Sequence, residues 1–255
     1  MEKKAFGFST GALGRGDVKK ALRVASGHAT EAVEYSALRA DELEPLVNLL
    51  LKQGAGDFRY VAVHAPSHFE PADEPRVVEL LKSLLDNVAV QNIVIHPDAI
   101  HDHGLWQQFG ERLCVENMDH RKPVGRTADE LAVIFGKLPK ARLCFDIGHA
   151  HEIDRSMSLG YEILRRFRDR IAHVHASEVS DDCQHGPFTA SSYAAFAKIT
   201  NMIPESAPVI LETDVPENRV ENQLKEARGL FGHSDSKRAN CKQPRGGDRI
   251  QRSLR

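Results

Sequence analysis

Long apolar runs are missing from this 255-residue chain. No segment approaches the ~18 consecutive apolar residues that a membrane-spanning helix needs, and the N-terminal stretch MEKKAFGFST lacks the apolar centre of a secretory signal. Cysteine is also scarce, since Cys114, Cys144, Cys183 and Cys241 form neither a CxxC pair nor a disulfide framework. We therefore expect a cytoplasmic protein with reduced thiols and no membrane partner.

The small net charge of -2 hides a difference between the body of the chain and its C-terminal end. Residues 233–255 contain seven basic and two acidic residues, which leaves 27 basic and 34 acidic residues in residues 1–232. The tail has too few apolar residues to offset its ordering entropy, so we expect it to be disordered. A binding arm for an anionic partner is the alternative for this basic tail. The acidic body disfavours nucleic acid as a partner.

Strand-type and helix-type segments alternate along residues 1–232. The strand-type segments are residues 5–9, 32–38, 60–64, 92–96, 112–117, 142–146, 171–177 and 209–213. Each is followed by a segment with helical periodicity, and this alternation is typical of a parallel sheet. Eight such pairs predict a (β/α)8 TIM barrel over residues 1–232 as a single α/β domain. An open doubly wound sheet is the alternative, but no GxGxxG motif follows the first strand.

Six of these strands end in a side chain that can bind a metal ion. These side chains are His64, His96, Glu116, Asp146, His175 and Glu212. The alternation of side chains along a strand directs all six into the barrel lumen, at the end where active sites of this architecture lie. Carboxylates that meet in a partly dry lumen repel one another unless a cation neutralises them.

We therefore predict that Glu116, Asp146, His175 and Glu212 hold a divalent cation. Buried acids are rare without partners, which makes this set more informative than a single residue. Mixed histidine and carboxylate ligands favour Zn, Mn, Co or Fe over Ca. A single inward histidine is more often a hydrogen-bonded core residue than a ligand, and this alternative holds for His64 and His96.

Two further groups of polar residues are less informative. His173 lies one layer deeper than His175, and we expect a structural role for it. Three basic residues, Arg121, Lys122 and Arg126, follow Glu116 closely. They are either solvated surface residues or contacts for an anionic group.

At these residues the sequence resembles the xylose isomerase-like TIM-barrel superfamily. This superfamily includes sugar phosphate isomerases and epimerases and the endonuclease IV-like zinc enzymes of AP endonuclease family 2. The resemblance covers residues 5–232. Its markers are the Glu116–Asn117 pair, the DxxH motif of Asp146 and His149, the HxS motif of His175 and Ser177, and Glu212 on the last strand.

The epimerase branch implies one metal ion on Glu116, Asp146, His175 and Glu212. In that branch, Glu116 and Glu212 would exchange protons with a small sugar or sugar phosphate through an enediolate, and His149 would contact the substrate hydroxyls. A cation that polarises the carbonyl and two carboxylates that act as base and acid suit this chemistry. The implied cofactor is a divalent metal ion (Mn, Co or Zn).

The endonuclease IV-like branch implies three zinc ions and phosphodiester cleavage at abasic sites in DNA. Its additional ligands have counterparts in His64, His96 and His185, whereas Cys183 takes the position of an aspartate. The residues that we expect to bind a second metal ion or the substrate are His64, His96, His149 and His185. The acidic body and the loop after His64, which has no aromatic wedge to open a duplex, favour a small substrate over DNA. A metal-binding barrel without catalysis is the third alternative.

Overall fold

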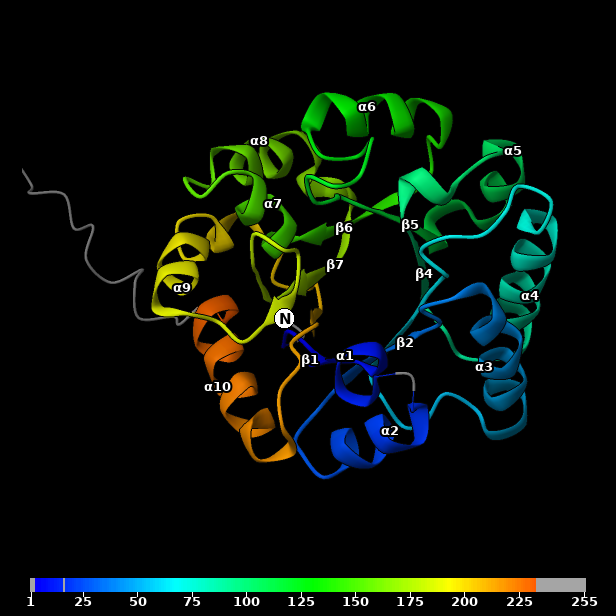
Figure 1. The fold of residues 1–255 in the computed structure, drawn as a ribbon, viewed down its shortest axis with the longest axis horizontal. Helices are drawn as coiled ribbons and strands as arrows, with labels where there is room; N and C mark the ends of the chain where they lie inside the picture. The colour runs from blue at the N-terminus through cyan, green and yellow to red at the C-terminus, as the bar shows by residue number, and fades with distance from the viewer. Residues whose placement is uncertain (1–2, 16, 233–255) are drawn as a thin grey trace, which may run out of the picture.

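Eight parallel strands close into a barrel in the computed structural model, which describes residues 3–15 and 17–232 (Figure 1). Around the barrel the strands are β1 (Phe6–Ser9), β2 (Ala32–Ser36), β3 (Tyr60–His64), β4 (Asn92–Ile95), β5 (Leu113–Glu116), β6 (Arg142–Asp146), β7 (Ile171–Ala176) and β10 (Val209–Leu211). Strand β10 pairs with both β7 and β1, which closes the ring. The predicted (β/α)8 barrel is therefore confirmed, and the open doubly wound sheet is excluded. The predicted tail, residues 233–255, lies outside the described residues.

Helices form a ring around the strands (Figure 1). They are α1 (Thr10–Gly14), α2 (Val18–Ser26), α3 (Ala40–Gln53), α4 (Glu74–Asn87), α5 (His103–Trp106), α6 (Ala128–Lys137), α7 (Ile147–Ile153), α8 (Ser158–Phe167), α9 (Ala190–Phe196) and α10 (Val220–Phe231). In α3, the residues Leu43, Leu46, Val47 and Leu50 are buried, as expected for an amphipathic helix with one apolar face. None of the described helices combines the length and the apolar character of a membrane crossing.

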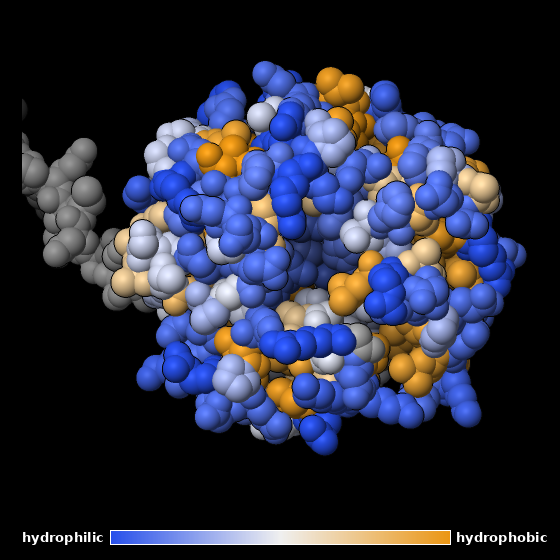
Figure 2. Space-filling model, viewed as in Figure 1, coloured by the Kyte–Doolittle hydropathy of each residue, from blue (hydrophilic) through white to orange (hydrophobic). Residues whose placement is uncertain are grey.

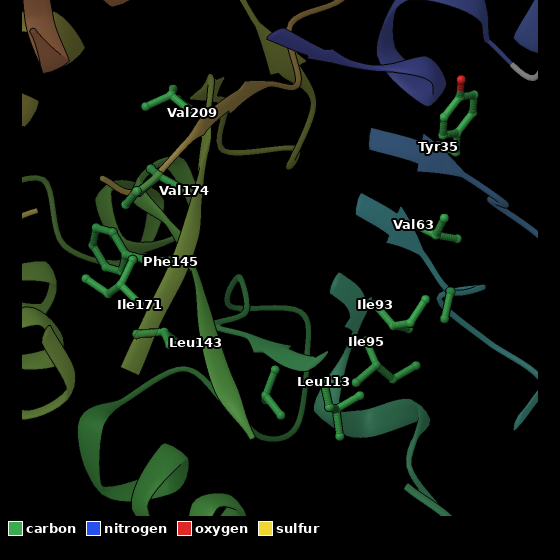
Figure 3. Packing of buried hydrophobic residues seen from close by; sticks show 14 of the residues in the cluster. Tyr35, Val63, Ile93, Ile95, Leu113, Leu143, Phe145, Ile171, Val174 and Val209 are labelled. Atoms are coloured by element: carbon green, nitrogen blue, oxygen red, sulfur yellow. The ribbon is translucent and has the colours of Figure 1, made fainter. Parts of the chain in front are cut away.

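The main core lies between the strands and the helices. Figure 3 shows Val63, Ile95 and Phe145 pointing outward from their strands into this layer, and all three are fully buried. Residues of the opposite parity fill the lumen, where Tyr60 and Ile210 pack with small alanines below the polar strand ends. The alternation of side chains along each strand therefore separates an apolar outer face from a lumen that becomes polar at one end.

Two short helices and a hairpin follow strand ends directly. Helix α1 begins at the residue after β1, and α7 begins at the residue after β6. The sequence analysis did not predict either helix, because each is too short to show a clear period. Beyond β7, the strands β8 (Glu178–Val179) and β9 (His185–Gly186) pair in an antiparallel hairpin. This hairpin brings His185 back to the barrel mouth.

Candidate metal centre at the barrel mouth

Four strand ends bring polar side chains together at the carboxyl end of the lumen. Glu116 ends β5, Asp146 ends β6, His175 lies in β7, and Glu212 follows β10. One possible ligand atom of each residue lies within 4.8 Å of the others. Glu116, Asp146 and His175 are buried, whereas the side chain of Glu212 is 17% exposed. The four residues predicted to share one cation therefore lie at coordination range of a common point.

Glu116 also belongs to a second group of ligand-type atoms. Its Oε1 lies 3.1 Å from Nδ1 of His175, and its Oε2 lies 3.1 Å from Nε2 of His64 and 3.4 Å from Nε2 of His96. His64, His96 and Glu116 again lie within 4.8 Å of one another. One carboxylate that serves two adjoining ligand sets suits a pair of cations.

Asp146 links the first set to a third. Its Oδ1 accepts a hydrogen bond of 2.7 Å from the backbone N–H of His149, which caps the start of α7. The His149 ring is held by the Asn117 carbonyl, 2.9 Å from Nδ1, and the His185 ring by the Ser177 hydroxyl, 2.8 Å from Nδ1. Asp146, His149 and His185 form a third set within 4.8 Å. All the predicted site residues therefore lie in one continuous cluster.

Cys183, which takes an aspartate position of the resemblance, does not belong to this cluster. Its Sγ lies 3.7 Å from Nδ1 of His120, and the two residues form a group with Asp119, whose Oδ2 lies 4.0 Å from Nε2 of His149. The guanidinium of Arg121 already binds both oxygens of the Asp119 carboxylate, at 3.1 and 2.8 Å. A cation would meet this positive charge, so we assign no metal to the group. The third set therefore has three possible ligands, Asp146, His149 and His185. Asp182, the acid next to Cys183 in the sequence, is exposed.

The residues present fit a divalent cation. The Oδ2 atom of Asp146 is buried without a hydrogen-bond partner among the described residues, and such an atom costs free energy unless something neutralises it. The three sets offer imidazole nitrogens and carboxylate oxygens, which Zn, Mn and Co accept. The donor chemistry and the unpaired Asp146 oxygen both support a metal centre at this position.

A pocket of about 480 Å³ opens above the three sets. Figure 2 shows it as a hydrophilic hollow in the middle of this face. Glu116, His149 and Glu212 line it, and so do the basic side chains of Arg121 and Lys122. Its volume is in the range of roughly 300–1,000 Å³ that is usual for small-molecule sites.

Residues 54–231 match the family described as the xylose isomerase-like TIM barrel. The chain belongs to this family. Similar solved structures include an L-ribulose 3-epimerase, with 15% identity, a TM-score of 0.60, and coverage of 88% of this chain and 86% of that chain. A candidate sugar phosphate isomerase/epimerase from Anabaena variabilis has 11% identity, a TM-score of 0.54 and 88% coverage of both chains. Sequence identities this low show only that this chain shares its fold with these structures. A search among curated proteins found no match.

One buried acid of this xylose isomerase-like barrel was not predicted from the sequence. Glu34 lies in β2, and its Oε2 is 3.0 Å from Nε2 of His175 and 3.3 Å from Nε2 of His173. His173 in turn contacts the Tyr60 hydroxyl through Nδ1 at 2.7 Å. Glu34 thus holds His175 so that Nδ1 faces Glu116, which is how outer carboxylates orient histidine ligands. The available signal was a glutamate of lumen parity within the strand AVEYS.

Burial and charge separate the pKa values of the xylose isomerase-like site. Burial raises the pKa of Asp146 to about 6 and also raises the pKa of Glu212. Burial acts in the same direction on Glu116, but the charge and hydrogen bonds of His175 and His64 outweigh it and hold the Glu116 pKa well below its usual range. Burial lowers the pKa of His64, yet its hydrogen bond to Glu116 outweighs this effect and raises the pKa to about 9. The metal-free site therefore retains a proton on His64 at neutral pH.

We expect a cation to displace protons when it binds this family member. A histidine ligand must be neutral, so binding at pH 7 should release protons from His64 and His175, whose pKa values are both raised. Because the His64 pKa is raised to about 9, the apparent affinity for Zn²⁺ should rise as the pH increases from 7 to 9. Calorimetric titration of chelator-treated protein with Zn²⁺, in buffers of different ionisation enthalpy, measures this release. A binding heat that is the same in every buffer would contradict the expectation.

Proposed function

We propose that this chain is a divalent-metal-dependent isomerase or epimerase that acts on a small sugar or sugar phosphate. The observation that carries the proposal is the pair of carboxylates, Glu116 and Glu212, in one ligand set at the floor of a pocket of small-molecule size. The sugar-processing names of the similar solved structures, among them L-ribulose 3-epimerase, lend further support.

The two glutamates are suited to different parts of a proton transfer. A divalent cation held by Glu116, Asp146, His175 and Glu212 would polarise a substrate carbonyl and stabilise an enediolate. Glu116, whose pKa is held low, remains ionised and accepts the proton next to the carbonyl. Glu212, the second glutamate of the same ligand set, would return a proton to the substrate. His149 lines the same pocket and would contact the substrate hydroxyls.

Phosphodiester hydrolysis is a second candidate, and one observation favours it. Glu116 and Asp146 each belong to two ligand sets, so the cluster offers places for more than one cation. Multinuclear centres of this kind activate water and neutralise a phosphoryl group. The third set is incomplete because Cys183 lies beside His120, and an acidic body weakens contact with duplex DNA. We therefore place hydrolysis second.

Proton exchange with solvent tests the proposal even while the sugar is unidentified. The full chain, loaded with Mn²⁺, Co²⁺ or Zn²⁺, is incubated in D₂O with a panel of ketoses and ketose phosphates. We expect NMR spectroscopy to show deuterium entering next to the carbonyl of at least one panel member. Cleavage of abasic duplex DNA or of bis(4-nitrophenyl) phosphate without any exchange would instead support the hydrolase. Full metal loading with neither reaction would indicate a metal-binding barrel without catalysis.

A further inference from the structure

The loop between β5 and α6, residues 117–127, is fixed against the candidate metal centre. The backbone N–H of Met118 donates to the Gly125 carbonyl at 3.0 Å, and that of Lys122 donates to the Asp119 carbonyl at 3.2 Å. Gly125 has a φ of +87°, and a Cβ at this position would lie 2.5 Å from Cγ of Pro97. Only glycine therefore allows the loop to pack against the residue that follows His96.

Two basic side chains on this loop are held in place by acids. Arg121 uses Nε and Nη2 to bind Asp119, which is 2% exposed, and this leaves Nη1 for a ligand. Lys122 donates from Nζ to Oδ2 of Asp98 at 2.8 Å, and the side chains are 22% and 17% exposed. The Lys122 pair is largely shielded from solvent, which fixes its ammonium group better than an exposed pair would. The Arg121 side chain is 50% exposed, and its two hydrogen bonds to Asp119 hold it in place.

The ammonium group of Lys122 lines the same pocket as the candidate ligands His64, His96 and Glu116. A cation on His64, His96 and Glu116 would repel this ammonium group across the pocket. An anion bound between Lys122 and such a cation removes the repulsion. Both Lys122 and Arg121 face the pocket.

We propose that Lys122 and Arg121 form a subsite for a phosphoryl group, so that the substrate of this pocket is a phosphate ester. Lys122 supplies a point charge next to the metal centre, and Arg121 supplies a planar donor that Asp119 orients. Arg15, which also lines the pocket, is paired with Asp214 but is 73% exposed, so solvent screens it. The inference deepens the proposed function and rests on it for the position of the substrate.

Binding measurements test the subsite separately from turnover. Isothermal titration of the Zn²⁺-loaded full chain uses a ketopentose, its 5-phosphate and bis(4-nitrophenyl) phosphate. We expect a phosphate ester to bind at least about tenfold more tightly than the free sugar, because hydrogen bonds to charged groups contribute strongly. Lys122→Met should remove most of that difference and leave the affinity for the free sugar unchanged. Tighter binding of the monoester identifies a sugar phosphate, whereas tighter binding of the diester identifies a phosphodiester.

Two further variants keep the result interpretable. Lys122→Met leaves the Asp98 carboxylate without its partner, so the double variant with Asp98→Asn tests the same loss without an orphaned charge. Lys82→Met is the matched control, because Lys82 also pairs with an aspartate, Asp86, at 3.0 Å but lies exposed on α4. Equal affinity for ester and free sugar, or an equal loss in Lys82→Met, would overturn the subsite. Selective ester binding without proton exchange would preserve the subsite and refute only the isomerase proposal.

Discussion

Glu212→Gln is expected to lower turnover by at least about a thousandfold, because a general acid–base group contributes roughly 10² to 10⁴ in rate and this residue also belongs to the ligand set. Glutamine has nearly the same shape but can neither carry the proton nor neutralise a cation. Glu212 follows β10 and is not one of the buried core residues, so the fold should persist. The rate of deuterium exchange measures turnover, and circular dichroism measures the fold.

A matched control uses a glutamate outside the ligand sets. The Glu178 side chain is 19% exposed, close to the value for Glu212, and it pairs with Arg155 rather than with the metal centre. Glu178→Gln should therefore exchange deuterium at nearly the rate of the unaltered chain. Normal exchange by Glu212→Gln, with its metal content intact, would refute the assignment of Glu212.

Removing the metal is expected to lower the melting temperature by roughly 8 to 16 °C. A ligand at about a thousandfold excess over its Kd stabilises the fold by about 4 kcal/mol, and each kcal/mol shifts Tm by about 2–4 °C in a domain of this size. The physical cause is the group of three acids, Glu116, Asp146 and Glu212, which repel one another when they lose their cation. Differential scanning calorimetry with and without chelator measures the shift.

Metal identity and a variant provide the controls for this shift. Zn²⁺, Mn²⁺ or Co²⁺ should restore Tm better than Ca²⁺, because Ca²⁺ prefers sites built from oxygen ligands alone. Glu116→Ala removes the carboxylate shared by two ligand sets, so its Tm should respond little to chelator or metal. An unaltered chain whose Tm is the same in chelator and in Zn²⁺ would show that no cation supports this fold.

Much of the barrel could be predicted because its pattern is local. Six of the eight strand-type segments carry, at or near their last residue, a side chain that can bind a metal ion. The two-residue alternation along a strand specifies which side chains enter the lumen. Glu116, Asp146 and His175 therefore lie where the sequence indicates, at adjoining strand ends. The spacing of Leu43, Leu46, Val47 and Leu50 likewise predicts the buried face of α3.

The remaining features depend on contacts between distant segments. Glu34 lies within β2, and only the closed barrel brings it 3.0 Å from His175, which is 141 positions away in the sequence. Lys122 lies in the loop after β5 and Asp98 in the short 3₁₀ helix Pro97–Ala99 after β4, so only the packing of these two segments brings the pair together. Cys183 could not be placed either, because the turn before β9 determines its direction and no periodic pattern covers that turn. The sequence pattern does not show which residues of distant segments become neighbours in the closed barrel.

The central claim is that acids and imidazoles from separate strands meet because a cation neutralises them. Elemental analysis of the purified full chain, beside Glu116→Ala prepared in parallel, tests this claim most directly. We predict at least one Zn, Mn, Co or Fe per chain in the unaltered protein, and its loss in the variant, which removes a ligand from two sets. A folded, unaltered chain that takes up none of these metals, even after incubation with each, would contradict the claim.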